Sequence, residues 1–197
     1  MSLASIFFDL SKLSESKKRL TGYASGYVNL TINTQITLNI TQETVNFSSG
    51  TMTPGPTNAT LRTVGIGAMT AIITGGNWSA DADALSFANI GNINCSISAK
   101  GNKNSQMFFG GGISDRAYQW NFSNKDPNSC GAWNETSARN VFADVNITTA
   151  IICSQLDYDI SRNEMLIDFK LVVPYNSNQT NTPISDIITI TGNVALP

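Results

Sequence analysis

The sequence predicts a mainly β protein, a two-layer β-sandwich preceded by an N-terminal α-helix. Three observations support this class. Short segments of alternating apolar and polar residues follow one another between turn residues, which is typical of sandwiches. Polarity comes from 22 Asn, 20 Thr and 21 Ser, while only 13% of the 197 residues are charged. These uncharged side chains suit strand faces and turns better than helices. Helical spacing occurs only near the start of the chain.

The N-terminal helix is expected over residues 1–22. Polar residues 14–19 follow its apolar part, and Gly22 marks its end. Its apolar stripe is predicted to mediate assembly and consists of Leu3, Ile6, Phe7, Leu10 and Leu13. A short helix attached through residues 21–26 cannot bury this stripe alone, so copies of the chain are its expected partners.

The same segment also bears on whether the chain is anchored in a membrane. Its uninterrupted apolar run, residues 3–8, is far too short to span a bilayer. The segment also lacks the features of a signal peptide. It is therefore expected to be either a processed N-terminus or the outer part of a longer membrane segment that precedes it.

The domain over residues 23–197 is expected to begin with a long strand over residues 28–40. Apolar residues occupy its even positions except Thr34, and Asn or Thr occupies most odd positions. Such a strand would be roughly 40 Å long, about twice what a small sandwich needs, so it either bends near Thr34 into two strands or contributes part of its length to another subunit. The even face is predicted to be buried, in part against other copies, and the odd face to point outward.

Further strands are expected along the domain, after a loop over residues 43–61 that holds two prolines and two glycines. They are expected at residues 68–74, 84–90, 93–100, 106–112, 117–123, 148–158, 164–174 and 184–196. The clearest alternation puts Met165, Ile167, Phe169, Leu171 and Val173 on one face.

Composition excludes several kinds of chemistry. The chain has no histidine, so a Ser-His-Asp or Cys-His mechanism is impossible within it. Its net charge is −2 and its basic residues are scattered, so nucleic acid is not an expected partner. No C-x-x-C motif indicates zinc or thiol redox chemistry. We predict no catalytic, cofactor or metal site and no enzymatic activity.

Two motifs resemble ligand loops but favour simpler interpretations. Residues 157–168 carry oxygen ligands at some calcium-loop spacings, but Arg162 stands where such a loop needs glycine, so a hairpin turn is expected. Residues 108–115 are glycine-rich but match no phosphate-binding motif, so a bulge or tight bend is expected.

N-glycosylation sequons, N-x-[S/T], occur ten times, whereas chance predicts about 4 or 5 in this composition. The excess favours an exported glycoprotein at the cell surface, with N-linked glycans on the outer face. Accidental sequons in Asn- and Thr-rich strands are the alternative. Asn94 is expected to stay bare because it borders a buried segment. The predicted acceptors are Asn29, Asn39, Asn46, Asn58, Asn77, Asn121, Asn134, Asn146 and Asn178.

The order of segments resembles archaeal pilin-like surface proteins. The resemblance is carried by the apolar N-terminal segment followed by "TGYASGYVNLTI", and by "SFANIGNINCSIS", "YQWNFSNKDPNSC" and "CSQLDYDISRNEMLIDFKLVVP". It covers most of the chain and implies an immunoglobulin-like sandwich behind an apolar helix. The helix differs from that of a type IV pilin in carrying Asp9 and Glu15 and in lacking glutamate at position 5.

The resemblance also implies a disulfide between Cys130 and Cys153, with Cys95 as the remaining thiol. Such a bridge would stabilise the domain by roughly 3 kcal/mol. Unpaired buried thiols are the alternative.

These patterns favour a structural subunit of an extracellular filament, with the helix in the filament core and the glycosylated sandwich outside. One alternative is a monomeric surface domain held at the membrane by an upstream segment. Another is a carbohydrate-binding adhesin module, for which tryptophan rings would form the platform. Trp120 alternates within a strand and is expected in the core, so Trp133, in a loop, is the candidate.

Overall fold

The structure is a computed structural model that describes residues 30–55, 57–67, 71–110, 115–134, 139–175 and 183–195. Contacts within the chain divide it into residues 1–33 and residues 34–197. The compact β unit thus begins at Thr34, whereas the sequence suggested Tyr23. The expected helix over residues 1–22, including its stripe, lies outside the described residues.

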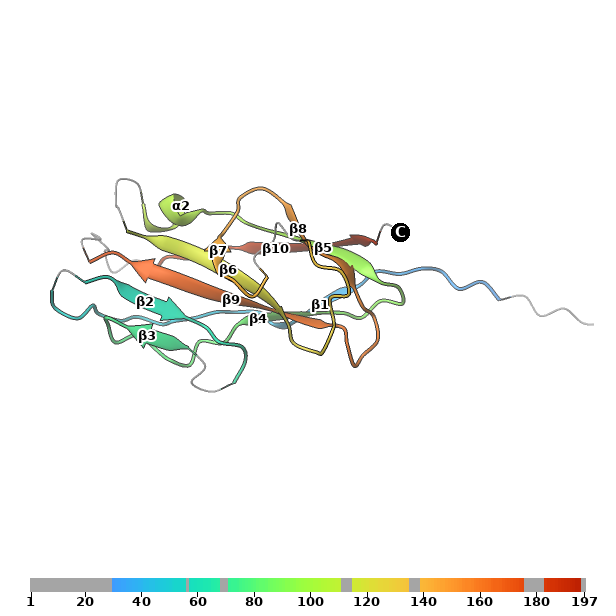
Figure 1. Cartoon of the computed structure of the whole chain (residues 1–197), viewed down its shortest axis with the longest axis horizontal. Coiled ribbons are helices and arrows are strands. Elements are labelled where there is room, and N and C mark those ends of the chain that lie inside the picture. Colours follow the sequence, from blue (N-terminus) through green and yellow to red (C-terminus); the bar gives the residue numbers. More distant parts are fainter. Residues whose placement is uncertain are drawn as a thin grey trace, which may run out of the picture. The chain divides into compact units, whose positions relative to one another are not determined.

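The larger of two sheets has seven strands, paired antiparallel. Its central strand is β9 (Glu164–Val173), which pairs on one side with β6 (Ala117–Asn124). On the other side, β4 (Leu85–Asn89) pairs with the first part of β9 and β2 (Ala59–Arg62) pairs with the last part. The edges are formed by β1 (Leu38–Gln42), β3 (Ile72–Thr74) and β7 (Ala143–Asp144). Figure 1 shows β6, β9, β2 and β3 side by side.

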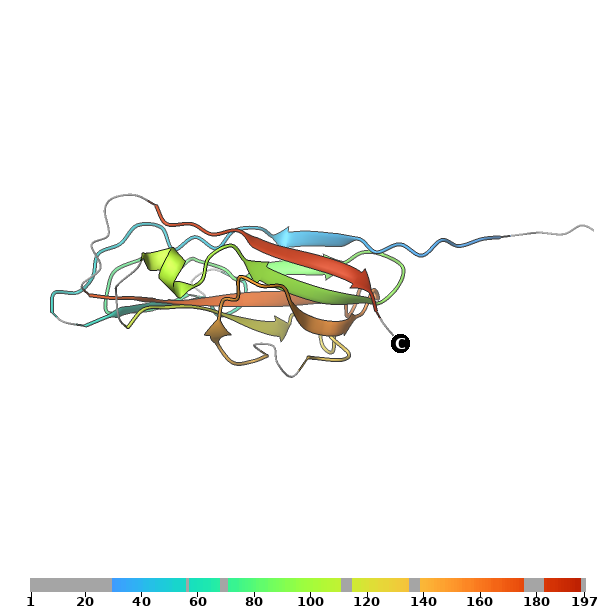
Figure 2. The same cartoon turned by 90° about the horizontal axis from the view of Figure 1, so that it is seen from above.

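The smaller sheet has three antiparallel strands. Its middle strand is β5 (Cys95–Gly101), which lies between β10 (Ile188–Val194) and β8 (Ala150–Leu156). Figure 2 shows β5 and β10 running alongside each other at an angle to β9. Both sheets are mainly built from residues far apart in sequence, as expected of a mainly β protein.

One apolar core joins the two sheets. Strand β9 supplies Met165 and Ile167, both fully buried, as its alternation predicts. The smaller sheet supplies Ile97 from β5 and Leu156 from β8 to the same cluster. Large side chains of the larger sheet complete this cluster: Phe87, Trp120, Phe122 and Phe169.

A second apolar cluster lies where β2 and β3 extend the larger sheet. Leu61, on β2, is only 1% exposed and packs with Phe47, Ala59 and Ala71. The expected loop over residues 43–61 therefore ends in a strand. The buried side chains of Ala59 and Leu61 decide this, because they face the cluster while β2 pairs with β9.

The expected strand at residues 106–112 is wrong. The described part of this segment is a short helix, α2 (Ser105–Phe109). The side chain of Asn104 caps it by accepting a hydrogen bond of 2.9 Å from the amide of Met107. Gly110 ends it with a positive φ of 84°, which suits glycine. Phe109 anchors the helix in the core.

The expected long strand over residues 28–40 is also wrong in its described part, because only β1 forms there. Residues 34–37 instead lie beside the turn between β4 and β5. In that turn the backbone amide of Asn92 donates a hydrogen bond of 3.0 Å to the Gln35 carbonyl. The even face is not buried throughout: Leu30 is 81% and Ile32 74% exposed. Ile40 lies opposite the buried Phe87 and so on the core face, but it is 46% exposed at the sheet edge.

Candidate functional site

The disulfide connects a long loop to the smaller sheet. Cys130, in the segment after β6, is bonded to Cys153 of β8 with an S–S distance of 2.06 Å and a Cα–Cα distance of 5.9 Å. This is the pair that the resemblance implied. Cys95 is the free thiol, fully buried on β5. Burial raises the pKa of Cys95 to about 11, so its reactive thiolate is scarce at neutral pH.

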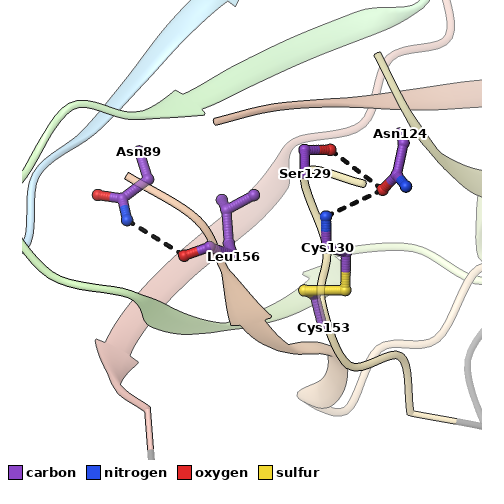
Figure 3. The surroundings of a disulfide bond; sticks show 6 residues. All are labelled: Asn89, Asn124, Ser129, Cys130, Cys153 and Leu156. Carbon is purple, nitrogen blue, oxygen red and sulfur yellow. Dashed lines mark hydrogen bonds between the residues drawn. A yellow bond between two sulfur atoms is a disulfide. The ribbon is translucent and has the colours of Figure 1, made fainter. Parts of the chain in front are cut away.

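An asparagine that sequence reasoning missed fixes the start of this loop. The Asn124 side-chain oxygen accepts hydrogen bonds from the Ser129 hydroxyl at 3.0 Å and from the Cys130 amide at 3.1 Å (Figure 3). Ser129 is fully buried. The turn-forming residues after Asn124 indicate a loop there, but the local sequence does not show which groups the Asn124 side chain binds.

The loop covers one edge of the smaller sheet. Cys130 forms an isolated bridge with Leu156, and Trp133 forms one with Cys153. Gly131 donates to the Gln155 carbonyl at 2.8 Å within the same contact. The outer edge of β8 is therefore occupied, and the disulfide holds the covering segment in place.

A hollow of about 590 Å³ lies beside the disulfide. Its lining is mostly polar and consists of Asn124, Asn128, Cys130, Gly131, Trp133, Asn134, Arg139 and Val141. The Arg139 guanidinium lies 5.2 Å from the centre of the Trp133 ring. One face of this ring is thus already engaged by a cation.

The other two tryptophans have packing roles. Trp120 is 3% exposed in the core, as the alternation predicts. Trp78 packs closely on the backbone of Gly50 and Gly76, where an added Cβ would come within 2.5 Å and 2.0 Å of its ring. Neither ring offers a free platform.

The sequons fall into three groups. Asn39, Asn46, Asn77 and Asn146 are exposed, whereas Asn58, Asn121 and Asn134 are half-buried. Asn29 and Asn178 lie outside the described residues. Asn94, expected to stay bare, is itself exposed although the neighbouring Cys95 is buried.

Two half-buried sequon asparagines are held within the fold. Asn58 accepts a hydrogen bond of 3.1 Å from the Tyr175 amide, which ties its side chain to the end of β9. The side-chain oxygen of Asn121, on β6, is buried without a hydrogen-bond partner.

The acidic segment after β8 forms a turn, as expected. Arg162 pairs with Asp157 at 3.1 Å and with Asp159 at 3.7 Å. Asp168 lies on the face of β9 opposite the core residues Ile167 and Phe169, where it is buried and accepts a hydrogen bond of 2.8 Å from Thr63. Across the described residues, no three His, Cys, Asp or Glu side chains are grouped so that they could hold a metal ion.

Glu164 ties four segments together at the start of β9. Its carboxylate, 15% exposed, accepts hydrogen bonds from Thr41 of β1, from Ser86 of β4 at 2.5 Å and from Lys125 at 2.7 Å. Burial alone would raise the pKa of Glu164. The hydrogen bonds from Lys125, Ser86 and Thr41 outweigh it, so the pKa lies below its usual value.

Comparison with known proteins finds no matching family model, no matching curated protein and no matching solved structure. In the part of the chain that the structure describes, no helix is long and apolar enough to cross a membrane.

Proposed function

We propose that the protein is a structural subunit of an extracellular filament. One observation carries the proposal: the chain divides into two contact units at Asn33, and the described end of the first unit carries apolar side chains that are exposed. The described examples are Leu30 and Ile32, which are 81% and 74% exposed. Exposed apolar residues in a dedicated segment favour association with other molecules.

In this proposal the stripe of residues 3–13 packs with its copies in the filament core. The unit from Thr34 onward is an immunoglobulin-like β-sandwich that faces outward. Two antiparallel sheets with one core and a buried tryptophan support that assignment. The abundance of sequons supports an exported, glycosylated surface at the cell exterior.

The accessible sequons define the expected glycan positions. Asn39, Asn46, Asn77 and Asn146 are exposed and point to modification, whereas Asn58, Asn121 and Asn134 are half-buried and therefore less accessible. An intact mass above the 21.1 kDa of the polypeptide, with glycopeptides at these positions, is the expected result for protein from its natural source. An unmodified mass would indicate that the sequons arose by chance and carry no glycans.

Particle mass and imaging test the filament itself. Native protein is expected to form polymers, and a variant lacking residues 1–20 is expected to remain folded but monomeric. Circular dichroism of both proteins separates loss of assembly from loss of folding. Polymers of the shortened variant would contradict a filament core formed by the N-terminal stripe, and a native protein that is monomeric at every concentration would contradict the filament. The second result would favour the membrane-anchored monomer.

A carbohydrate-binding adhesin module is the second candidate, favoured by the hollow that Trp133 lines. A sugar ring would have to displace Arg139 or use the other face of the indole. Tryptophan fluorescence during titration with mono- and oligosaccharides tests it, with Trp133→Ala as the comparison. If Trp133→Ala retains the sugar-dependent fluorescence quench, the sugar does not bind in this hollow.

A further inference from the structure

The two edges of the smaller sheet differ. The edge of β8 is covered by the loop that Cys130 pins, through the bridges at Cys130 and Trp133. Within the described residues, no strand pairs with the outer edge of β10. Strand β10 has seven residues, whereas the edge strands β1 and β3 of the larger sheet have five and three. Among the described strands at the ends of the two sheets, β10 therefore has the longest edge without a pairing strand, and open edges readily accept another strand.

The core beside β10 is incompletely covered. Ile36 and Leu38 reach across to Gly192 of β10, where an added Cβ would lie 3.1 Å and 3.2 Å from their side chains. The next core-facing residue, Ile40, is 46% exposed. At the end of β10, Val194 is 61% exposed. An apolar strip thus continues past the last strand of the smaller sheet.

The chain contains a segment that fits this strip. Residues 28–32 alternate between apolar and polar side chains, as a half-buried strand does. Leu30 and Ile32 are the described apolar members, and they are 81% and 74% exposed. They belong to the contact unit of residues 1–33, which is separate from the unit that begins at Thr34.

We propose that residues 28–32 of one copy pair with β10 of a second copy and add a fourth strand to its smaller sheet. Main-chain hydrogen bonds would satisfy the open edge of β10, while Leu30 and Ile32 would extend the core face beside Ile40. Thr31 would then share the outer face with Thr191. This inference rests on the proposed filament and names the contact between its subunits.

A second copy fits better than the same copy. Gln35 is fixed by Asn92, with hydrogen bonds of 2.7 Å and 3.0 Å between them. A turn within residues 33–34 would bring residues 28–32 back alongside β1, which belongs to the larger sheet. Pairing with β1, in either copy, would widen that sheet and leave the core face of Ile40 open. The edge of β10 is the position that covers it.

Cross-linking of full-length chains tests the pairing. One chain carries Thr31→Cys and a second carries Thr189→Cys, Thr191→Cys or Asn193→Cys, all in a Cys95→Ala background. Adjacent strands lie about 4.8 Å apart, within reach of a disulfide for the facing pair. We expect oxidation of the mixed assembly to join the chains at one or two of these β10 positions. Thr74→Cys on β3 and Asn39→Cys on β1, both exposed, are the matched controls.

Charge substitutions supply the second arm. Leu30→Asp and Ile32→Asp alter exposed residues and should leave the thermal unfolding of the sandwich unchanged. We expect them to reduce polymer formation at least tenfold. Ile160→Asp, at a residue 88% exposed in the turn after β8, should leave polymers intact.

The outcomes separate the two proposals. Polymers that tolerate both Asp variants, or that cross-link at Asn39 or Thr74 instead of β10, would overturn the strand pairing and leave the filament standing. Cross-links that form equally in dilute solution within one doubly substituted chain would show pairing in the same copy. A native protein that never polymerises would overturn both.

Discussion

Removing the disulfide should lower the stability of the β unit substantially without changing its fold. The perturbation is Cys130→Ala together with Cys153→Ala, compared with reduction of the unchanged pair. The bond closes a loop with a sequence separation of 23 residues. Within it, residues 130–134 cover β8, while few large apolar side chains anchor the loop.

The magnitude follows from the loop length. For a separation of 23 residues, the chain-entropy model gives about 3.4 kcal/mol of stabilisation. With a urea dependence of about 2 kcal/mol per molar, the unfolding midpoint should fall by about 1.7 M. The slope should rise slightly, because the unfolded chain becomes less compact once the cross-link is gone.

Urea unfolding followed by tryptophan fluorescence measures this change. Cys95→Ala is present in every sample, so that no thiol exchange occurs in the unfolded chain. Reduced protein keeps both sulfur atoms, whereas the double variant loses them. The difference between these two samples therefore reports the packing of the buried sulfurs, separately from the cross-link.

A decrease below about 1 kcal/mol in both samples would refute the reasoning, because it would place the bond outside the cooperative unit. Loss of the cooperative transition in the double variant alone would show that sulfur packing outweighs loop closure.

Three further outcomes follow from individual groups. Glu164→Gln should lower the free energy of unfolding by about 2 kcal/mol at pH 7. Because the folded pKa is depressed, this difference should be complete above about pH 4.3 and disappear as the pH falls through the lower folded pKa; a difference that persists at pH 2 would contradict it. Cys95, with its pKa raised to about 11, should resist iodoacetamide at pH 7.5 in the folded state and react on unfolding, as mass spectrometry would record. Leu61→Ala should lower the free energy of unfolding by about 2–4 kcal/mol, measured by thermal or urea unfolding. Ile72→Ala, at a neighbouring β3 residue that is 48% exposed, should lower it by under about 1 kcal/mol. Similar losses for both variants would indicate that the second cluster is not part of the cooperative unit.

Most strand positions were predictable from the sequence because alternation is a local property. In β9, the period of two fixes which side chains share a face, and Met165 and Ile167 are buried accordingly. The sequons and the three cysteines are likewise visible in the sequence. The absence of histidine excludes whole classes of mechanism, since those mechanisms need its imidazole.

The tertiary structure decided which alternating segments find partners. Residues 28–32 have as clear a pattern as β9, but Leu30 and Ile32 are exposed, and no strand in the part of the chain that the structure describes pairs with them. Conversely, the aromatic pair in α2 favours a strand locally, yet the Asn104 cap and the core contact of Phe109 select a helix. The open edge of β10 and the closed edge of β8 also depend on contacts between residues distant in sequence. A residue pattern records which face is apolar, but the neighbour that covers that face is set by the three-dimensional packing of the whole chain.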